Sequence, residues 1–187
     1  KVIVPAMNTK MYHNPIVQEN ILKLKRHGYY FIEPVSGLLA CGGTGKGKME
    51  DPTGIVEELC LIANQTKEMV GCKVTVTAGA TTEDIDPVRY LTNRSTGKMG
   101  YAIAEQAILK GATVVLISGK TNLKPPRGLS KFIEVRSAEE MYQEVKREFF
   151  DTDILIKAAA VADFTPKVVA KNKIKKQDEN LVIDLKR

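Results

Sequence analysis

The hydrophobic residues of this chain recur in two spacings, which alternate along its second half. Residues 97–110 and 137–149 carry apolar side chains at helical spacing and have the length of ordinary helices. Strands that alternate with such helices predict βαβ units around a parallel sheet, and therefore an α/β fold. The runs that predict these buried strands are GCKVTVTAGAT, TVVLIS, FIEV and DILIKAAAV.

The first 70 residues predict the order strand, helix, strand, loop, helix. A domain boundary is expected near residue 70, within KEMVGCK, and it separates residues 1–70 from residues 71–187. Near the other end of the chain, a basic loop (KVVAKNKIKKQDEN) precedes a final predicted strand, LVIDL. In chain order, the first part predicts a strand at VIVPA, a helix from Pro15 to Gly28, a strand at YYFIEPV, a long Gly- and Lys-rich loop (SGLLACGGTGKGKMEDP) and a helix from Pro52 to Glu68.

Composition narrows the class of protein. The 187 residues are 43% hydrophobic, and no run approaches the roughly 18 apolar residues of a membrane span. Cys41, Cys60 and Cys72 fit no zinc-binding spacing, and their odd number indicates a reducing compartment. We therefore expect a soluble cytoplasmic protein with no membrane partner. Because the chain begins at Lys1 rather than at a methionine, we also expect it to be a piece of a longer protein.

The net charge of +6 is consistent either with nucleic-acid binding or with an enzyme that handles polyanionic phosphates. Aromatic residues make up only 6% of the chain, and they do not cluster with the basic residues. A nucleic-acid-binding domain is therefore the weaker of the two interpretations, and nucleic acid is not expected as a partner.

Three short motifs fail when their spacing is examined. GTGKGK resembles a dinucleotide fingerprint, but Lys48 stands where the third glycine is needed. Gly119-Lys120-Thr121 has the tail of a P-loop, but Val114 stands where its first glycine is needed. Ser95 to Lys98 matches S-x-x-K, whose SDN and KTG companion motifs are absent from the chain.

The stretch TNRSTGKMG predicts a helix start that could bind phosphate. Ser95 or Thr96 can cap the helix, Gly97 allows a ligand close to the backbone, and the first-turn N–H groups carry partial positive charge. A cap without a ligand is the commoner meaning of such a pattern. However, TAGAT supplies a second glycine turn at the end of a predicted strand, where ligands bind in open α/β sheets.

Several longer stretches together resemble one family. VTAGATTEDIDPVRYLTNRSTGKMG, KAAAVADF and KNKIKKQ are similar, in this order, to phosphopantothenate–cysteine ligases, and PAMNTKMYHNP and ACGGTGKGKM are similar to the end of phosphopantothenoylcysteine decarboxylases. The order is that of the bifunctional enzymes of coenzyme A biosynthesis. The resemblance implies a Rossmann-like parallel-sheet ligase domain preceded by the C-terminal part of a flavodoxin-like decarboxylase domain.

The resemblance also implies the chemistry. The ligase would join 4′-phosphopantothenate to cysteine with CTP and Mg²⁺, through an acyl-cytidylate, and the decarboxylase would use FMN to form 4′-phosphopantetheine. No protein ligands for Mg²⁺ can be named from the sequence, and it does not decide between CTP and ATP. The family forms homo-oligomers, with ligase dimers and decarboxylase trimers that a dodecamer would combine.

Site residues follow from the motifs that match. The resemblance assigns acyl-cytidylate formation to Lys173 and turnover of that intermediate to Asn93. Arg89 would orient the substrate, and Ser95, Thr96 and Gly97 would bind phosphate. Without the resemblance, these residues would be a solvated charge, a helix-entry residue, an ordinary salt-bridge partner and a plain cap. The nucleotide would be bound by Lys157, Ala158, Ala159, Asp163, Lys173 and Gly79.

In the first domain, the resemblance makes Asn8 the residue that holds the substrate carboxylate and Cys41 the proton donor to the enethiolate. The FMN-binding strands and the catalytic histidine of the decarboxylase are not in this sequence, and neither is the end of the ligase. We therefore expect this stretch alone not to decarboxylate. One alternative stays open: a non-catalytic module of the same fold that binds CTP or phosphopantothenate.

Overall fold

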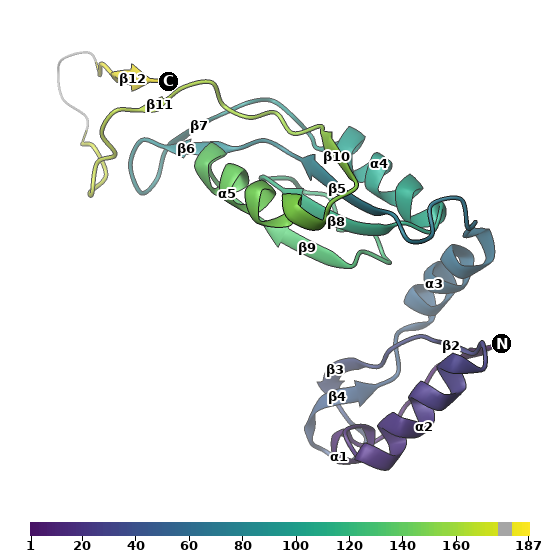
Figure 1. Ribbon diagram of the computed structural model, residues 1–187. Coiled ribbons are helices and arrows are strands. Elements are labelled where there is room, and N and C mark those ends of the chain that lie inside the picture. The colour runs from purple at the N-terminus through teal and green to yellow at the C-terminus, as the bar shows by residue number, and fades with distance from the viewer. Residues whose placement is uncertain (176–180) are drawn as a thin grey trace. The chain divides into compact units, whose positions relative to one another are not determined.

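A computed structural model describes residues 1–175 and 181–187, which form two compact units, residues 1–64 and 65–187 (Figure 1). The second unit begins with a connecting segment tied to the end of its first helix. There the Thr66 N–H donates to the Leu109 carbonyl at 2.7 Å, and the Met69 N–H donates to the Lys110 carbonyl at 2.8 Å. The boundary expected near residue 70 lies a few residues later, within this segment.

The second unit is built on one parallel sheet, so the predicted α/β fold is confirmed. In space, the strands β9, β8, β5 and β10 lie in the order third, second, first and fourth along the chain, which is the order of the first four strands of a Rossmann sheet. The elements are β5 (Lys73–Ala78), α4 (Lys98–Leu109), β8 (Thr113–Ser118), β9 (Lys131–Glu134), α5 (Ala138–Glu148), the 3-10 turn η1 (Phe149–Asp151) and β10 (Ile154–Lys157).

Helices α4 and α5 pack on opposite faces of this sheet (Figure 1). Neighbouring side chains of a strand point to opposite faces. Accordingly, Ser118 accepts a hydrogen bond from Tyr101 of α4 at 3.1 Å, whereas Ile117 packs with Met141 of α5. Because both faces are covered, the two central strands, β5 and β8, are buried along almost their whole length, including polar residues such as Thr75 and Ser118. Completely buried strand residues include Val74, Val76, Val114 and Leu116.

Two small antiparallel pairs complete the second unit, and neither was fully predicted. β6 (Thr82–Asp84) pairs with β7 (Tyr90–Thr92), and strands this short leave no clear alternation in the sequence. β11 (Thr165–Pro166) pairs with β12 (Leu185–Lys186). The final strand was expected at 181–185, but only Leu185 of that range belongs to β12. Residues 176–180 of the expected basic loop lie outside the described residues.

The first unit follows the predicted order up to residue 31, except for one short helix, Thr9–Tyr12, that was not predicted. Strands β1 and β2 pair in parallel, with two helices between them in the chain. Each short strand pairs with only one other strand, and α3 follows after a second sheet of two strands. The elements are β1 (Val2–Ile3), α1 (Thr9–Tyr12), α2 (Pro15–Arg26), β2 (Tyr30–Phe31), β3 (Val35–Leu38), β4 (Thr44–Lys48) and α3 (Pro52–Asn64).

The prediction of one long Gly- and Lys-rich loop was wrong, because β3 and β4 form an antiparallel hairpin within it. Glycine is disfavoured in strands in general. Here it is required, since a Cβ on Gly47 would lie 2.1 Å from the Met7 carbonyl oxygen. The Met7 N–H also donates to the Gly47 carbonyl at 2.9 Å. Close approach of a distant segment therefore explains a composition that predicted a loop.

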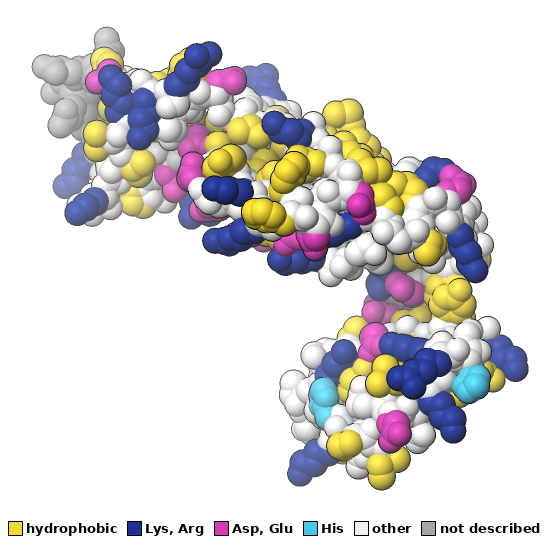
Figure 2. Space-filling view, viewed as in Figure 1, with side chains coloured by type: hydrophobic (Ala, Val, Ile, Leu, Met, Phe, Trp, Pro, Cys, Tyr) yellow, Lys and Arg dark blue, Asp and Glu magenta, His cyan; other side chains and the backbone are white. Residues whose placement is uncertain are grey.

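The surface carries charges of both signs. On the face of the second unit seen in Figure 2, lysine and arginine side chains are interspersed with acidic ones rather than gathered in one stripe. In the part of the chain that the structure describes, no helix combines the length and the hydrophobicity needed to cross a membrane.

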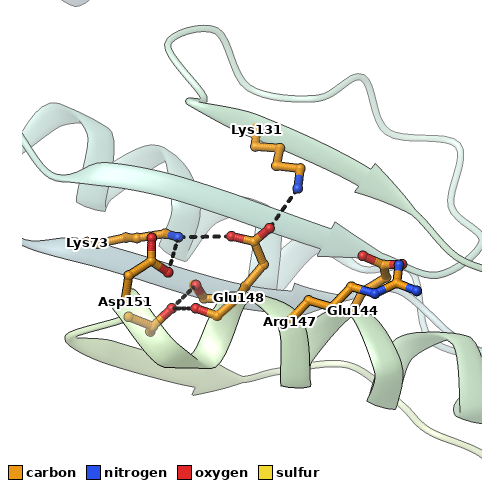
Figure 3. Close-up of polar contacts among 8 residues, drawn as sticks. Lys73, Lys131, Glu144, Arg147, Glu148 and Asp151 are labelled. Carbon is orange, nitrogen blue, oxygen red and sulfur yellow. Dashed lines mark hydrogen bonds and ion pairs between the residues drawn. The ribbon is translucent and has the colours of Figure 1, made fainter.

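Where α5 ends, an ion network centred on the nearly buried Glu148 ties the helix to the sheet. Glu148, with 11% of its side chain exposed, lies between Lys73 and Lys131 (Figure 3). Its carboxylate oxygens lie 2.9 Å from the Lys73 Nζ and 2.7 Å from the Lys131 Nζ, and the Lys73 Nζ also bonds Asp151 at 2.6 Å. First Lys131 and then Lys73 hold the pKa of Glu148 below its ordinary value.

Replacing Glu148 with Gln is expected to destabilise the second unit by about 1–3 kcal/mol in urea unfolding, because Lys73 then loses a partner in a poorly solvated place. Since the folded pKa of Glu148 is lowered, its contribution is present above the unfolded value of about 4.3 and lost as the pH falls through the folded one. The stability difference from wild type should therefore shrink below about pH 4.

The matched control for this variant is Glu144→Gln, on the same helix. Glu144 pairs with Arg147, whose side chain is 70% exposed, so its loss should cost less than about 0.5 kcal/mol. Equal destabilisation by the two variants would contradict the role given to the network.

Candidate functional site

Strands β5 and β10 continue as paired backbone beyond their carboxyl ends. The Ala160 N–H donates to the Gly79 carbonyl at 2.8 Å, and the Thr81 N–H donates to the Ala160 carbonyl at 3.2 Å. These are the first and fourth strands of the sheet along the chain, so the order of strands reverses between them. Ligands of open α/β folds bind at such a switch point.

Asn93 lies at this switch point. Its side-chain Nδ2 donates to the carbonyls of Ala160 at 3.2 Å and Val161 at 3.1 Å. Both N–H donors of the amide are thereby directed to the backbone that follows β10, which fixes the orientation of the side chain. The structure thus brings Asn93 together with the KAAAV stretch, which lies 67 residues away along the chain.

Four of the residues expected to bind nucleotide, Lys157, Ala158, Ala159 and Asp163, lie at or beyond the end of β10, whereas Gly79 follows β5 and is buried. The Ala158 N–H donates to the Thr77 carbonyl at 3.1 Å, and the Ala159 N–H donates to the Thr77 Oγ1 at 3.3 Å. Both alanines are partly exposed, and Lys157 is exposed. Asp163 is exposed further along the same segment.

Helix α4 begins beside the turn that follows β5. Gly97 is its N-cap, with φ +77°, and a Cβ there would lie 3.2 Å from both the N and the Cα of Gly79. The expected side-chain cap was wrong: no side chain caps α4, and the Ser95 Oγ instead accepts a hydrogen bond from the Gly97 N–H at 3.3 Å. Only glycine allows the helix start to approach the strand end this closely.

A cavity of about 410 Å³ opens in front of this helix start. Lys120, which lines this cavity, was not assigned to the site from the sequence. Lys120 follows β8 and donates to the Tyr90 hydroxyl at 2.5 Å, and its Nζ lies 4.6 Å from the centre of the Tyr90 ring. The sequence signal that could have identified Lys120 is its position just after a buried strand, at the edge of the sheet where ligands bind. Residues that line the cavity include Asn93, Ser95, Thr96, Lys98, Lys120 and Thr121.

Arg89 and Lys173 lie elsewhere, outside the described lining of this cavity. Arg89 forms a two-pronged contact with Asp86, with its Nε at 3.0 Å and its Nη2 at 2.5 Å from Oδ2. The Arg89 guanidinium is the main reason that the pKa of Asp86 is held far below its ordinary value. Lys173 is exposed, and its neighbour Ile174 contacts this pair.

The first unit brings its two expected site residues together. The Asn8 Nδ2 donates to the Cys41 Sγ at 3.2 Å, and the Asn8 Oδ1 caps α1 by accepting from the Lys10 N–H at 2.8 Å. Both residues line a cavity of about 380 Å³ with largely apolar walls that include Met7, Leu38, Leu39 and Met49. Hydrogen bonds from the Gly43 backbone and from Asn8 lower the pKa of the Cys41 thiol.

Cys41 is therefore expected to react with iodoacetamide a few-fold faster than Cys60 at about pH 7, because the thiolate is the nucleophile. Both thiols are exposed, so Cys60 serves as an internal control for access. Replacing Asn8 with Ala should slow the alkylation of Cys41 and leave that of Cys60 unchanged, as peptide mass spectrometry can measure. Equal rates for both thiols in the wild type would contradict this expectation.

Within residues 1–175 and 181–187, no three histidine, cysteine or acidic side chains come together as ligands for a metal ion. A Mg²⁺ ion that arrives with a nucleotide is held largely by phosphate and water oxygens, so it needs no protein cage. The absence of such a cluster among these residues is therefore compatible with a metal–nucleotide substrate.

Two protein-family models match the chain. The model described as "DNA/pantothenate metabolism flavoprotein C-terminal domain" matches residues 69–187, more than half of the chain. The model described as "Flavoprotein" matches residues 1–64. These two ranges correspond closely to the two compact units.

The chain is also similar to proteins named coenzyme A biosynthesis bifunctional protein CoaBC. The one from Bacillus subtilis is 51% identical over 99% of this chain and 46% of that protein. The one from Haemophilus influenzae is 44% identical over 98% of this chain and 46% of that protein. A crystal structure of the C-terminal domain of CoaBC matches with a TM-score of 0.57 and 44% identity, over 65% of this chain and 56% of that one. The chain thus spans less than half the length of these two curated relatives.

Proposed function

Because this chain belongs to the family of DNA/pantothenate metabolism flavoprotein C-terminal domains, we propose that its second unit is the main part of a phosphopantothenate–cysteine ligase. The observation that carries the proposal is the placement of Asn93, whose amide is held by the Ala160 and Val161 carbonyls at the switch point of the sheet. An asparagine that only stabilised the interior of the protein would not need to lie at the edge of the sheet where ligands bind.

In the first half-reaction, a carboxylate oxygen of 4′-phosphopantothenate attacks the α-phosphate of CTP and pyrophosphate leaves. Negative charge accumulates on phosphate oxygens, so the reaction is accelerated by cations and N–H donors placed there beforehand. Lys173 supplies one such cation. The first turn of α4, which Gly97 brings to the end of β5, supplies N–H groups, with Ser95 and Thr96 beside it, and Lys120 adds charge across the cavity.

In the second half-reaction, the cysteine amine attacks the activated acyl carbon, and CMP leaves. Asn93 orients the acyl group, and Arg89 orients the pantothenate part of the substrate. The nucleotide lies against the ends of β5 and β10, where the small side chains of Ala158 and Ala159 are partly exposed. Gly79, in contrast, is buried, and a Cβ there would lie 2.7 Å from the Gly119 carbonyl oxygen, so it contributes by allowing this close packing. Lys157 and Asp163 contact the nucleotide at its rim, and Mg²⁺ is held by its phosphates.

The first unit is proposed to be the end of a phosphopantothenoylcysteine decarboxylase. Asn8 binds the substrate carboxylate and Cys41 returns a proton to the enethiolate, consistent with their contact at 3.2 Å. The largely apolar walls of their cavity fit a planar flavin ring beside the substrate. FMN, when bound in the full-length protein, would supply a reversible oxidation, taking a hydride from the thiol-bearing carbon before CO₂ leaves and returning it afterwards. We expect that protein to be a homo-oligomer, with ligase dimers and decarboxylase trimers.

Pyrophosphate release tests the ligase function directly. The full-length protein is given phosphopantothenate with CTP or with ATP, with and without cysteine. Release with at least one nucleotide is expected, and the comparison decides between CTP and ATP. Binding of nucleotide and phosphopantothenate without any pyrophosphate would instead support the non-catalytic module and overturn the ligase function.

A further inference from the structure

The turn between β6 and β7 contains a fully buried carboxylate, Asp86, which the resemblance did not single out. Its Oδ1 accepts the backbone N–H groups of Val88 at 2.8 Å and Arg89 at 2.9 Å, which closes the turn. Its Oδ2 accepts the Arg89 guanidinium and, at 3.1 Å, the backbone N–H of Ile174. Ile174 is 88 residues further along the chain, so this last bond joins two separate segments.

Arg89 binds the carbonyl group of Ile174. Its Nη2 donates to the Ile174 carbonyl oxygen at 2.7 Å. Ile174 therefore has its N–H bound to Asp86 and its carbonyl bound to Arg89, so one ion pair satisfies both backbone polar groups of one loop residue. A second tie lies nearby, where the Ala170 N–H donates to the Ile85 carbonyl at 2.9 Å. The loop backbone is therefore held at two positions, Ala170 and Ile174, by the segment that contains Ile85, Asp86 and Arg89.

The clamped residue is adjacent to Lys173. Their Cα atoms are about 3.8 Å apart across a trans peptide, so the position of Ile174 sets where the Lys173 side chain begins. A lysine has a long side chain with many rotamers, and a mobile loop would add backbone freedom to them. Restraining the backbone beforehand leaves only the side chain to be ordered when the substrate binds.

We propose that Asp86 and Arg89 form a positioning clamp on Ile174 that places Lys173 for acyl-nucleotide formation. The inference rests on the ligase function proposed above. Asp86 is a positioning residue, because its carboxylate is completely buried and reaches the reaction only through the Ile174 backbone. Arg89 has, in this view, a structural partner as well as the substrate that the family resemblance assigns to it.

The test replaces Asp86 with Asn in the full-length enzyme, which keeps the shape but removes the charge that binds Arg89 and Ile174. Pyrophosphate release from phosphopantothenate and CTP is expected to fall by up to about 100-fold. The reaction of chemically prepared acyl-cytidylate with cysteine should fall far less, because Lys173 acts only in the first half-reaction and Arg89 keeps its guanidinium for the substrate. A merely destabilised protein would lose both half-reactions equally, and that result would overturn the proposal.

A double variant tests whether Asp86 acts through Lys173. If it does, Asp86→Asn should lower pyrophosphate release no further in a Lys173→Gln background, because residues that act through one another are not additive. Independent, multiplying losses would overturn the clamp as a device that serves Lys173.

Hydrogen–deuterium exchange reports on the clamp without any activity. Exchange in residues 167–175 should become faster in Asp86→Asn and stay unchanged in the matched control Asp84→Asn. Asp84 lies on the same β6–β7 hairpin as Asp86, but its carboxylate pairs with Arg136 instead. Unchanged exchange in Asp86→Asn would overturn the clamp. Should that variant fail to fold, Arg89→Lys keeps the ion pair, loses the guanidinium fork, and is expected to give the same faster exchange.

These readouts separate the two proposals. If the wild type releases no pyrophosphate but Asp86→Asn still loosens residues 167–175, the ligase function is overturned, and with it the catalytic purpose of the clamp. If pyrophosphate is released normally by both proteins while exchange increases, the ligase function stands and the clamp is shown not to serve Lys173.

Discussion

Replacing Lys173 with Gln is expected to lower pyrophosphate release by about 100- to 1,000-fold. Carboxylate attack on the α-phosphate brings two anionic groups together, and the ammonium group offsets the charge that builds up on the phosphate oxygens. Glutamine keeps much of the length and polarity but removes the charge. The measurement is pyrophosphate release by the full-length protein with phosphopantothenate and CTP, without cysteine.

Lys175→Gln is the matched control, because it removes the same charge from the same loop two residues away. Lys175 is also exposed, so its loss changes the general attraction for phosphates in a similar way. A much smaller loss is expected from it. Comparable losses in the two variants would mean that the loop acts only as a diffuse positive charge, and the specific role of Lys173 would have to be abandoned.

Replacing Asn93 with Asp is expected to stop the reaction at the acyl-nucleotide, with the second half-reaction slowed by about 100- to 1,000-fold. The two side chains have nearly the same shape, but aspartate has no N–H to donate to the Ala160 and Val161 carbonyls. An anionic oxygen would instead face these carbonyl oxygens and be repelled. The side chain should turn away and no longer orient the acyl group for attack by cysteine.

The measurement is a single burst of pyrophosphate, about one per site, together with acyl-cytidylate detected by mass spectrometry after quenching. Asn122→Asp is the control, because Asn122 lines the same cavity and the variant adds the same negative charge. It is expected to show no accumulated intermediate. Normal turnover by Asn93→Asp, or equal accumulation in both variants, would refute the role given to Asn93.

The local pattern of the sequence was sufficient to predict the strands and helices of the parallel sheet in the second unit. The apolar run at β8 and the helical spacing of α4 and α5 each contain enough consecutive residues to reveal their period. Their alternation then leads directly to a parallel sheet. The same reasoning failed for β3 and β4, because their glycines are explained by the approach of Met7 and not by their own neighbours.

The candidate site, like the fold, was predicted only in part from the sequence. Motif resemblance was enough to single out Asn93, Lys173, Asn8 and Cys41 as individual residues. Their placement was not in the sequence: the contact of Asn8 with Cys41 spans 33 residues, and that of Asn93 with Ala160 spans 67. Lys120 entered the site only because β8 ends beside β5.

By itself, then, the sequence determined the class of fold, the family and the residue types that carry the proposed chemistry, because periodicity and motifs are properties of neighbouring residues. Tertiary structure alone decided which glycines are required by close approach, that α4 begins without a side-chain cap, and that Asp86 and Arg89 hold Ile174. Each of these depends on hydrogen bonds or close packing between segments far apart in the chain, which no local pattern encodes.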